Sequence, residues 1–185
     1  MTYELRPKTQ LARDMKHTIS VLVENKFGVL ARISGLFSAR GFNISSLAVG
    51  ETEDPTVSRM TIVVEGDDRT LEQIKKQLNK LIDVIKVVDF KDGEFIDREL
   101  ILLKVSVTAK NRKEVLEAIE SAGAGIENAG AKSISIVVVG DQTKIHGLLE
   151  LLRPFGILEV VRTGRVAMST EDKGLKVEGK PEVNE

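Results

Sequence analysis

The sequence predicts an α+β fold built from two tandem units with the same order of elements, βαββαβ. The first observation is that strand and helix patterns alternate in this order twice along the 185 residues. The second is that Gly66-Asp67 and Gly140-Asp141 occupy the same place in the two runs. The third is that Val87-Val88 matches Val160-Val161 at nearly the same offset. We therefore expect an internal repeat of two ferredoxin-like units, each with two helices over one face of a four-stranded antiparallel sheet.

The elements of the first unit follow from hydrophobic spacing and turn residues. Ile19, Val21 and Val23 alternate with Thr18, Ser20 and Leu22, which is typical of a half-buried strand. Gly41 lies where a helix needs a left-handed stop. The expected elements are a strand that starts near His17, a helix from Val29 to Phe37, a hairpin of strands Ile44 to Val49 and Val57 to Val64, a capped helix carrying Leu71, Ile74, Leu78 and Leu81 with Lys75, Lys76 and Lys80 turned to water, and a strand from Asp83 to Phe90.

The second unit repeats this order less clearly. Its expected elements are a strand Arg98 to Ala109, a helix Arg112 to Ala122, strands Ile126 to Ala129 and Ile134 to Val139, a helix carrying Ile145, Leu148, Leu149 and Leu152, and a strand Leu158 to Arg162. We expect four segments: a loosely held N-terminal arm (1–16), a first domain (17–92), a second domain (93–169) and a charged tail (170–185) that stays disordered.

Composition narrows the possible functions. The net charge of −1 gives no global field that would attract nucleic acid or an anionic membrane. The chain has no cysteine, which excludes disulfides, thiolate catalysis and cysteine zinc sites. No signal peptide is recognisable, and no apolar run approaches the roughly 20 residues that span a bilayer. We expect a cytoplasmic protein with no nucleic-acid or membrane partner.

Catalytic residues are scarce in this sequence. The histidines are His17, at the start of a strand, and His146, on a helix, and both positions are typical of ordinary surface residues. The neighbouring acidic residues that could act as a pair lie in a turn, with Glu51, Glu53 and Asp54, and in the tail, with Glu171-Asp172, and both places are typical of solvated acids. Histidines and carboxylates show no metal-ligand spacing. We therefore expect no catalytic residue, metal or cofactor in this chain.

The informative segment is the loop Glu24 to Leu30, which joins the first strand to the first helix. Backbone N–H groups at a helix start lack intrahelical partners and carry the positive end of the helix dipole, so a carboxylate fits there. Asn25 could cap the helix or bind a ligand, and Gly28 lets a ligand approach the backbone. Val29, Leu30 and Ile44 could form an apolar socket for a branched side chain. The alternative is that Asn25 and Gly28 only shape a turn.

A family resemblance favours the ligand-binding interpretation. The segments Asn25 to Ile33 and Phe37 to Ile44 resemble the ACT domain, an amino-acid-sensing module of metabolic enzymes. Adding Asp54 to Thr61, Leu71 to Leu81 and Arg98 to Val105 makes the chain similar to the small regulatory subunits of acetolactate synthase, also called acetohydroxyacid synthase. The similarity runs from about His17 to Ser169 and is stronger in the first unit.

The resemblance implies a regulatory function without catalysis. In that family a separate catalytic (large) subunit carries thiamine diphosphate, magnesium and FAD, whereas the small subunit activates it and confers feedback inhibition by valine or a related branched-chain amino acid. Carried over by motif, one subunit of a homodimer would bind the effector with Asn25, Gly28, Val29 and Leu30. The neighbouring subunit would add Asn43 and Ile44, which gives two effector sites per dimer.

Three alternatives remain. An ACT protein could sense another amino acid for a different metabolic enzyme or a transcription regulator, and Arg98 to Val105 argues against that. An RNA-binding module shares the βαββαβ order, but it stacks bases on strand aromatics, and aromatic residues make up only 4% of this chain. A small hydrolase on the same fold would need a set of catalytic residues, and the sequence contains no convincing one.

The role of the second unit is a separate question. This unit could dock on the catalytic chain or dimerise separately.

Overall fold

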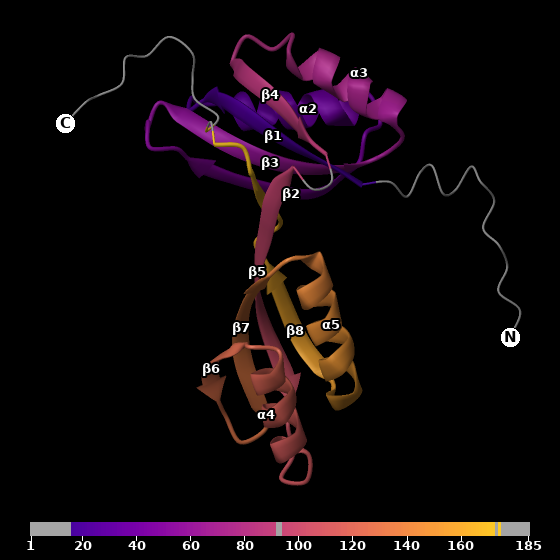
Figure 1. Cartoon of the computed structure of the whole chain (residues 1–185), viewed down its shortest axis with the longest axis vertical. Helices are drawn as coiled ribbons and strands as arrows, with labels where there is room; N and C mark the ends of the chain where they lie inside the picture. Colours follow the sequence, from indigo (N-terminus) through magenta and orange to yellow (C-terminus); the bar gives the residue numbers. More distant parts are fainter. Residues whose placement is uncertain (1–15, 92–93, 173, 175–185) are drawn as a thin grey trace, which may run out of the picture. The chain divides into compact units, whose positions relative to one another are not determined.

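The computed structural model describes residues 16–91, 94–172 and 174, and it divides into two compact units (Figure 1). Of the described residues, the first unit contains those up to residue 96 and those from residue 167 onward, and the second contains residues 97–166. Each unit has an antiparallel sheet with two helices, so the α+β prediction is confirmed. Within the described residues no helix is long and apolar enough to cross a membrane.

The first unit contains a four-stranded sheet in the order β2-β3-β1-β4. Helices α2 and α3 cover one face of this sheet (Figure 1). Strands β1 and β3 are central, and β2 and β4 are the two edges. The elements are β1 (Lys16–Glu24), α2 (Val29–Ala39), β2 (Ile44–Glu51), β3 (Val57–Glu65), α3 (Asp68–Leu78) and β4 (Val84–Phe90), as the sequence predicts in type and order.

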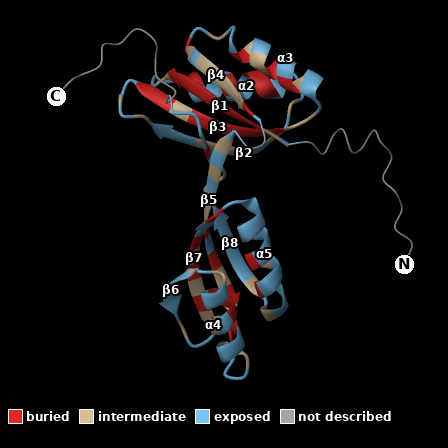
Figure 2. Ribbon diagram, viewed as in Figure 1, coloured by how far each residue is buried: buried red, intermediate tan, exposed pale blue. Residues whose placement is uncertain are grey.

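Strand β1 is buried on both faces, which corrects the expectation of a half-buried strand (Figure 2). Ile19 faces the helices and is fully buried, but Ser20 on the opposite face is buried as well. Part of the cover on this face comes from β9 (Val166–Ser169), a strand that the sequence pattern did not predict. The N–H of Ala167 in β9 donates to Oγ1 of Thr61 (3.4 Å), and Thr61 is the β3 residue paired with Ser20. The returning chain thus contacts the second face of this sheet at Thr61.

Helix α3 begins at a cap that recurs in the second unit. The Asp67 carboxylate accepts hydrogen bonds from the N–H and Oγ1 of Thr70, at 2.8 and 2.6 Å. A Cβ on Gly66 would lie 2.7 Å from Cγ2 of Thr70, so only glycine fits before the cap. The helix ends at Leu78, which leaves Leu81 outside it although Leu81 still packs against the core. Lys75, expected to face water, reaches the carboxylate of Asp89 at 3.6 Å.

The second unit has the sheet order β6-β7-β5-β8, and β9 pairs with β5. Asp141 caps its second helix through the N–H of Lys144, as Asp67 does in the first unit. The strand β5 begins at Phe95, earlier than expected, and ends at Ser106. The elements are β5 (Phe95–Ser106), α4 (Arg112–Ser121), β6 (Gly125–Ala129), β7 (Ser133–Gly140), α5 (Gln142–Leu152), a short 3-10 helix η1 (Arg153–Phe155) and β8 (Ile157–Arg162).

One face of the second sheet is open. Ile101 and Leu103 are buried against α4 and α5, whereas Leu102, Val139 and Val161 are about half exposed on the other face. This face carries a groove of about 330 Å³.

The two terminal segments expected from the sequence lie mostly outside the described residues. Of the arm only Lys16 is described, and of the tail only residues 170–172 and 174 are described.

Candidate functional site

The loop between β1 and α2 turns sharply at Gly28. This residue is the N-cap of α2 and has φ of +82°, a left-handed conformation that glycine adopts without steric cost. The turn is closed by backbone bonds from the N–H of Lys26 to the carbonyl of Glu24 (3.0 Å) and from the N–H of Val29 to the carbonyl of Lys26 (3.4 Å). Glycine is therefore favoured at position 28 because the backbone there has a positive φ.

The start of helix α2 keeps backbone donors free. No side chain within the described part of the chain caps this helix. The N–H groups of Leu30 and Ala31 have no hydrogen-bond acceptor among the residues that the structure describes. Such N–H groups point out of the helix and carry its positive partial charge, so they favour an anionic ligand group. A carboxylate could therefore accept hydrogen bonds at this end of α2.

Arg32 lies over the same turn. Its Nη1 is 3.4 Å from the position that a Cβ on Gly28 would occupy. Its Nε donates to Oδ2 of Asp83 at 2.7 Å. The Asp83 side chain is only 11% exposed, whereas that of Arg32 is 50% exposed. The sequence-based prediction gave Arg32 no role, although its position four residues after Gly28 places both on one side of the helix.

Asn25 does not cap α2, which corrects one of its two expected roles. Its Nδ2 donates to Oε1 of Glu51 (3.0 Å) and to the carbonyl of Pro55 (2.9 Å), and its own N–H donates to the carbonyl of Thr56 (2.7 Å). Asn25 therefore ties the loop to the hairpin between β2 and β3. Its side chain remains exposed to solvent.

The expected apolar socket is only partly present in one chain. Val29 is 3% exposed and packs into the core of the first unit, so its side chain cannot line a ligand site. Leu30 is 45% exposed beside the turn. Ile44 is half-buried and packs against the same core. Val29 can therefore contribute only backbone atoms, and Leu30 is an exposed apolar side chain on the first turn of α2, where the free N–H groups lie.

Asn43 and Ile44 lie at the far end of the sheet from Asn25. Ile44 at the start of β2 pairs with Val64, which in turn pairs with His17 at the start of β1. Asn25 follows the other end of β1, next to Glu51 at the end of β2. Asn43 is exposed and directly precedes β2. The predicted site residues thus form two separate groups within one chain.

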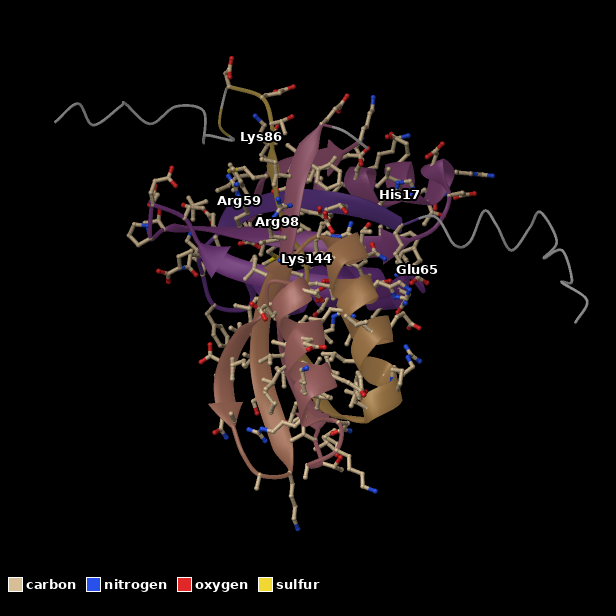
Figure 3. The ribbon with its side chains drawn as sticks, turned by 60° about the horizontal axis from the view of Figure 1, so that its bottom comes forward. His17, Arg59, Glu65, Lys86, Arg98 and Lys144 are labelled. Atoms are coloured by element: carbon tan, nitrogen blue, oxygen red, sulfur yellow. The ribbon has the colours of Figure 1, made fainter. Side chains whose placement is uncertain are left out.

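The titratable groups that the structure describes, inside this loop and outside it, form no catalytic arrangement. His17 Nε2 lies 3.1 Å from the carbonyl of Gly66, and Figure 3 shows His17 at the end of the sheet near Glu65. His146 is exposed on α5. The hydrogen bond and charge of Glu24 raise the pKa of Lys26 above its ordinary value. Across the described ranges, no group of three or more histidines and carboxylates could hold a metal ion.

Each of the two units matches a known protein family. Residues 19–86 match the family described as the AHAS small subunit-like ACT domain. Residues 98–171 match the family described as the small subunit of acetolactate synthase. These two ranges contain the motifs that carried the resemblance in the sequence.

Whole-chain relatives give the same result. The chain is 50% identical over 159 residues to the acetolactate synthase small subunit of Mycobacterium bovis, and these residues cover 86% of this chain and 95% of that protein. It is 51% identical to the probable acetolactate synthase small subunit of Archaeoglobus fulgidus, over 86% of this chain and 99% of that one. The crystal structure of the acetolactate synthase small subunit from Thermotoga maritima superposes with a TM-score of 0.79 at 37% identity, over 86% and 99% of the two chains. The resemblance is confirmed, and the chain belongs to the family of acetolactate synthase small subunits.

Proposed function

We propose that this chain is the regulatory subunit of acetolactate synthase and that it binds valine or a related branched-chain amino acid at the start of α2. In this function it activates a separate catalytic subunit in the cytoplasm and confers feedback inhibition in branched-chain amino acid biosynthesis. The observation that supports it most directly is the uncapped start of α2 at Gly28, with two free N–H groups beneath the Arg32 guanidinium. Family membership supplies the identity of the partner enzyme.

Each part of an amino acid has a complement at the proposed site. The carboxylate would accept hydrogen bonds from the N–H groups of Leu30 and Ala31, above Gly28. Asn25, with its amide oxygen at the end of an exposed side chain, would accept a hydrogen bond from the ligand ammonium group. The exposed Leu30 side chain would contact the branched side chain of the ligand.

The second half of the site would come from another copy of the chain. Within one chain, β2 runs seven residue steps from Ile44 to Glu51, which is about 23 Å at 3.3 Å per residue, so Asn43 cannot reach the loop of its own chain. Strand β2 is an edge of the sheet and has backbone groups free to pair. Antiparallel pairing of two β2 edges about a two-fold axis would bring Asn43 and Ile44 of one copy beside Glu51 of the other. Because Glu51 contacts Asn25, this pairing would complete two equivalent sites per dimer.

The function is allosteric and needs no reacting group in this chain. The catalytic subunit would hold thiamine diphosphate, magnesium and FAD, and the chemistry would take place there. An effector bound between two copies shifts an equilibrium only if it prefers one arrangement of them, and a site shared by two chains provides such a preference. A coupling free energy of about 1–3 kcal/mol between effector binding and catalytic activity would give a useful response.

The test is isothermal titration of the full chain with valine, leucine, isoleucine and serine, followed by activity assays with the catalytic subunit. We expect saturable binding of at least one branched-chain amino acid at one site per chain, no binding of serine, and inhibition of the reconstituted enzyme by the same ligand. Binding of an unrelated amino acid without inhibition would favour an ACT sensor for another enzyme. Absence of heat with all three branched-chain amino acids would contradict the site.

A further inference from the structure

We propose that Arg32, held in place by Asp83, is the side chain that selects for a free carboxylate on the effector. This inference rests on the proposed function, because it assigns a residue to the same site. It concerns specificity: without Arg32 the site would still hold an amino acid but would discriminate poorly between a carboxylate and a neutral amide.

The position of Arg32 on α2 directs its side chain back over the helix start. In an α-helix the Cα–Cβ bonds tilt toward the N-terminus, and residues four apart lie on one face. Arg32 follows Gly28 by four residues, and its Nη1 lies 3.4 Å from the Cβ position of Gly28. The guanidinium therefore lies above the turn at which the N–H groups of Leu30 and Ala31 point outward.

Asp83 fixes this orientation from outside the helix. Its Oδ2 accepts a hydrogen bond from Nε of Arg32 at 2.7 Å. Asp83 is itself immobilised, because its side chain is mostly buried and its carbonyl accepts the N–H of Glu24 at 2.9 Å. The guanidinium has five N–H donors, and this pair uses the one on Nε, so the donors on the two terminal nitrogens remain for a ligand.

The charge balance of the site favours an added carboxylate. A cation beside the positive end of a helix dipole is unfavourably placed unless an anion accompanies it. The Asp83 carboxylate compensates Arg32 on the side of Nε. A ligand carboxylate above Gly28 would meet the uncompensated helix start and the terminal nitrogens of Arg32 together. A neutral amide in the same place would accept hydrogen bonds through its carbonyl oxygen but would lack the attraction between net charges, so it would bind more weakly.

The size of the effect follows from the strength of hydrogen bonds to charged groups. Losing such a bond in a partly exposed site corresponds to about a 10- to 100-fold loss of affinity. Lysine would not replace arginine fully, because its single ammonium cannot bond Asp83 and a ligand carboxylate in one rigid plane. The selectivity for carboxylate over amide should therefore fall in the order arginine, lysine, glutamine at this position.

The experiment measures the ratio of two dissociation constants, for valinamide and for valine, by isothermal titration of the full chain. We expect the ratio to be large in the natural chain, to fall about 10-fold or more in Arg32→Gln, and to take an intermediate value in Arg32→Lys. In Asp83→Asn, which leaves Arg32 charged but loosely held, we expect a smaller decrease of the ratio. Asn25→Ala is the matched control, since it should weaken both ligands and leave the ratio unchanged.

The outcomes separate this inference from the proposed function. If the natural chain binds valine and Arg32→Gln keeps the natural ratio, the role assigned to Arg32 is wrong while the effector site stands. The same conclusion holds if Arg32→Gln weakens the binding of both ligands equally, because the pair with Asp83 would then be only structural. If the natural chain binds no branched-chain amino acid, the proposed function itself fails. Should Arg32→Gln not fold, Arg32→Lys decides: an unchanged ratio there overturns the inference and a reduced one supports it.

Discussion

The Nδ2 of Asn25 donates to Oε1 of Glu51 across 3.0 Å, which joins the loop before α2 to the last residue of the edge strand β2. This contact connects the two parts of the molecule that the proposed dimer would use, the ligand loop and the pairing edge. Removal of the Asn25 amide should therefore affect ligand binding more than stability, because its hydrogen bonds to Glu51 and to the carbonyl of Pro55 are both exposed and each contributes only about 1 kcal/mol to folding.

Asn25→Ala is expected to lower the affinity for valine at least about 10-fold, because the ligand ammonium loses an acceptor and the loop loses its tie to β2. Titration calorimetry measures the affinity, and thermal unfolding checks the fold. Glu51→Gln is the matched control, since it keeps an oxygen acceptor for Asn25 and should stay within about threefold of the natural affinity. Equal affinities in all three chains would remove Asn25 from the site.

Gly28→Asp should abolish valine binding. The aspartate carboxylate would lie next to Nη1 of Arg32, where the ligand carboxylate is expected, and the two carboxylates would compete for this place. The left-handed backbone costs a side chain about 1 kcal/mol, and aspartate and asparagine tolerate it better than other residues. Gly28→Asn, of the same size but uncharged, should retain more affinity than Gly28→Asp, and the opposite order would contradict an anion site here.

Val49→Lys should weaken dimerisation and valine binding together. Val49 is 47% exposed on the edge strand β2, and a lysine on an edge strand opposes pairing with another sheet. Analytical ultracentrifugation measures the dimer and calorimetry the ligand. Ile85→Lys, on the opposite edge strand β4, is the control and should leave both unchanged. A monomeric Val49→Lys chain that still binds valine normally would show that one chain contains the whole site.

Asp67 should make the first unit sensitive to acid. Hydrogen bonds from the side chain and N–H of Thr70 lower the pKa of the Asp67 carboxyl below its ordinary value. A lowered folded-state pKa contributes stability that is present above the ordinary pKa and is lost as the pH falls through the lowered one.

The measurement for Asp67 is the melting temperature between neutral pH and about pH 3. The natural chain should lose more of its melting temperature over this range than Asp67→Asn, which keeps the capping oxygen without the titration. Glu53→Gln, at an exposed turn, should behave like the natural chain. Parallel curves for the natural chain and Asp67→Asn would show that this cap does not depend on its charge.

Leu148→Ala should destabilise the second unit by about 2–5 kcal/mol, because Leu148 is 2% exposed and its removal leaves a cavity in a core separate from that of the first unit. Urea unfolding would measure the loss. Valine affinity should remain within about twofold of the natural value. Ile74→Ala, in the core of the first unit, should lower both the stability and the valine affinity. If Leu148→Ala and Ile74→Ala lowered the valine affinity equally, the two units would not act separately.

The sequence by itself determined the order of elements, the internal repeat and the loop that starts α2. Each of these depends on local properties: hydrophobic spacing sets strands and helices, Asp67 and Asp141 cap their own helices, and Gly28 is needed for a positive φ. The same local signals gave the motif that identified the family.

Only the tertiary structure decided which side chains of that motif are available to a ligand. Val29 faces the core because the helix places it there, and Asn25 bonds Glu51 because the hairpin comes back beside the loop. Asp83 reaches Arg32 from 51 positions away along the chain, and Ala167 in β9 reaches Thr61, the β3 residue paired with Ser20 of β1, from still farther. These contacts join segments distant in sequence, and hydrophobic periodicity reports only the environment of neighbouring residues, so no local pattern could have predicted them.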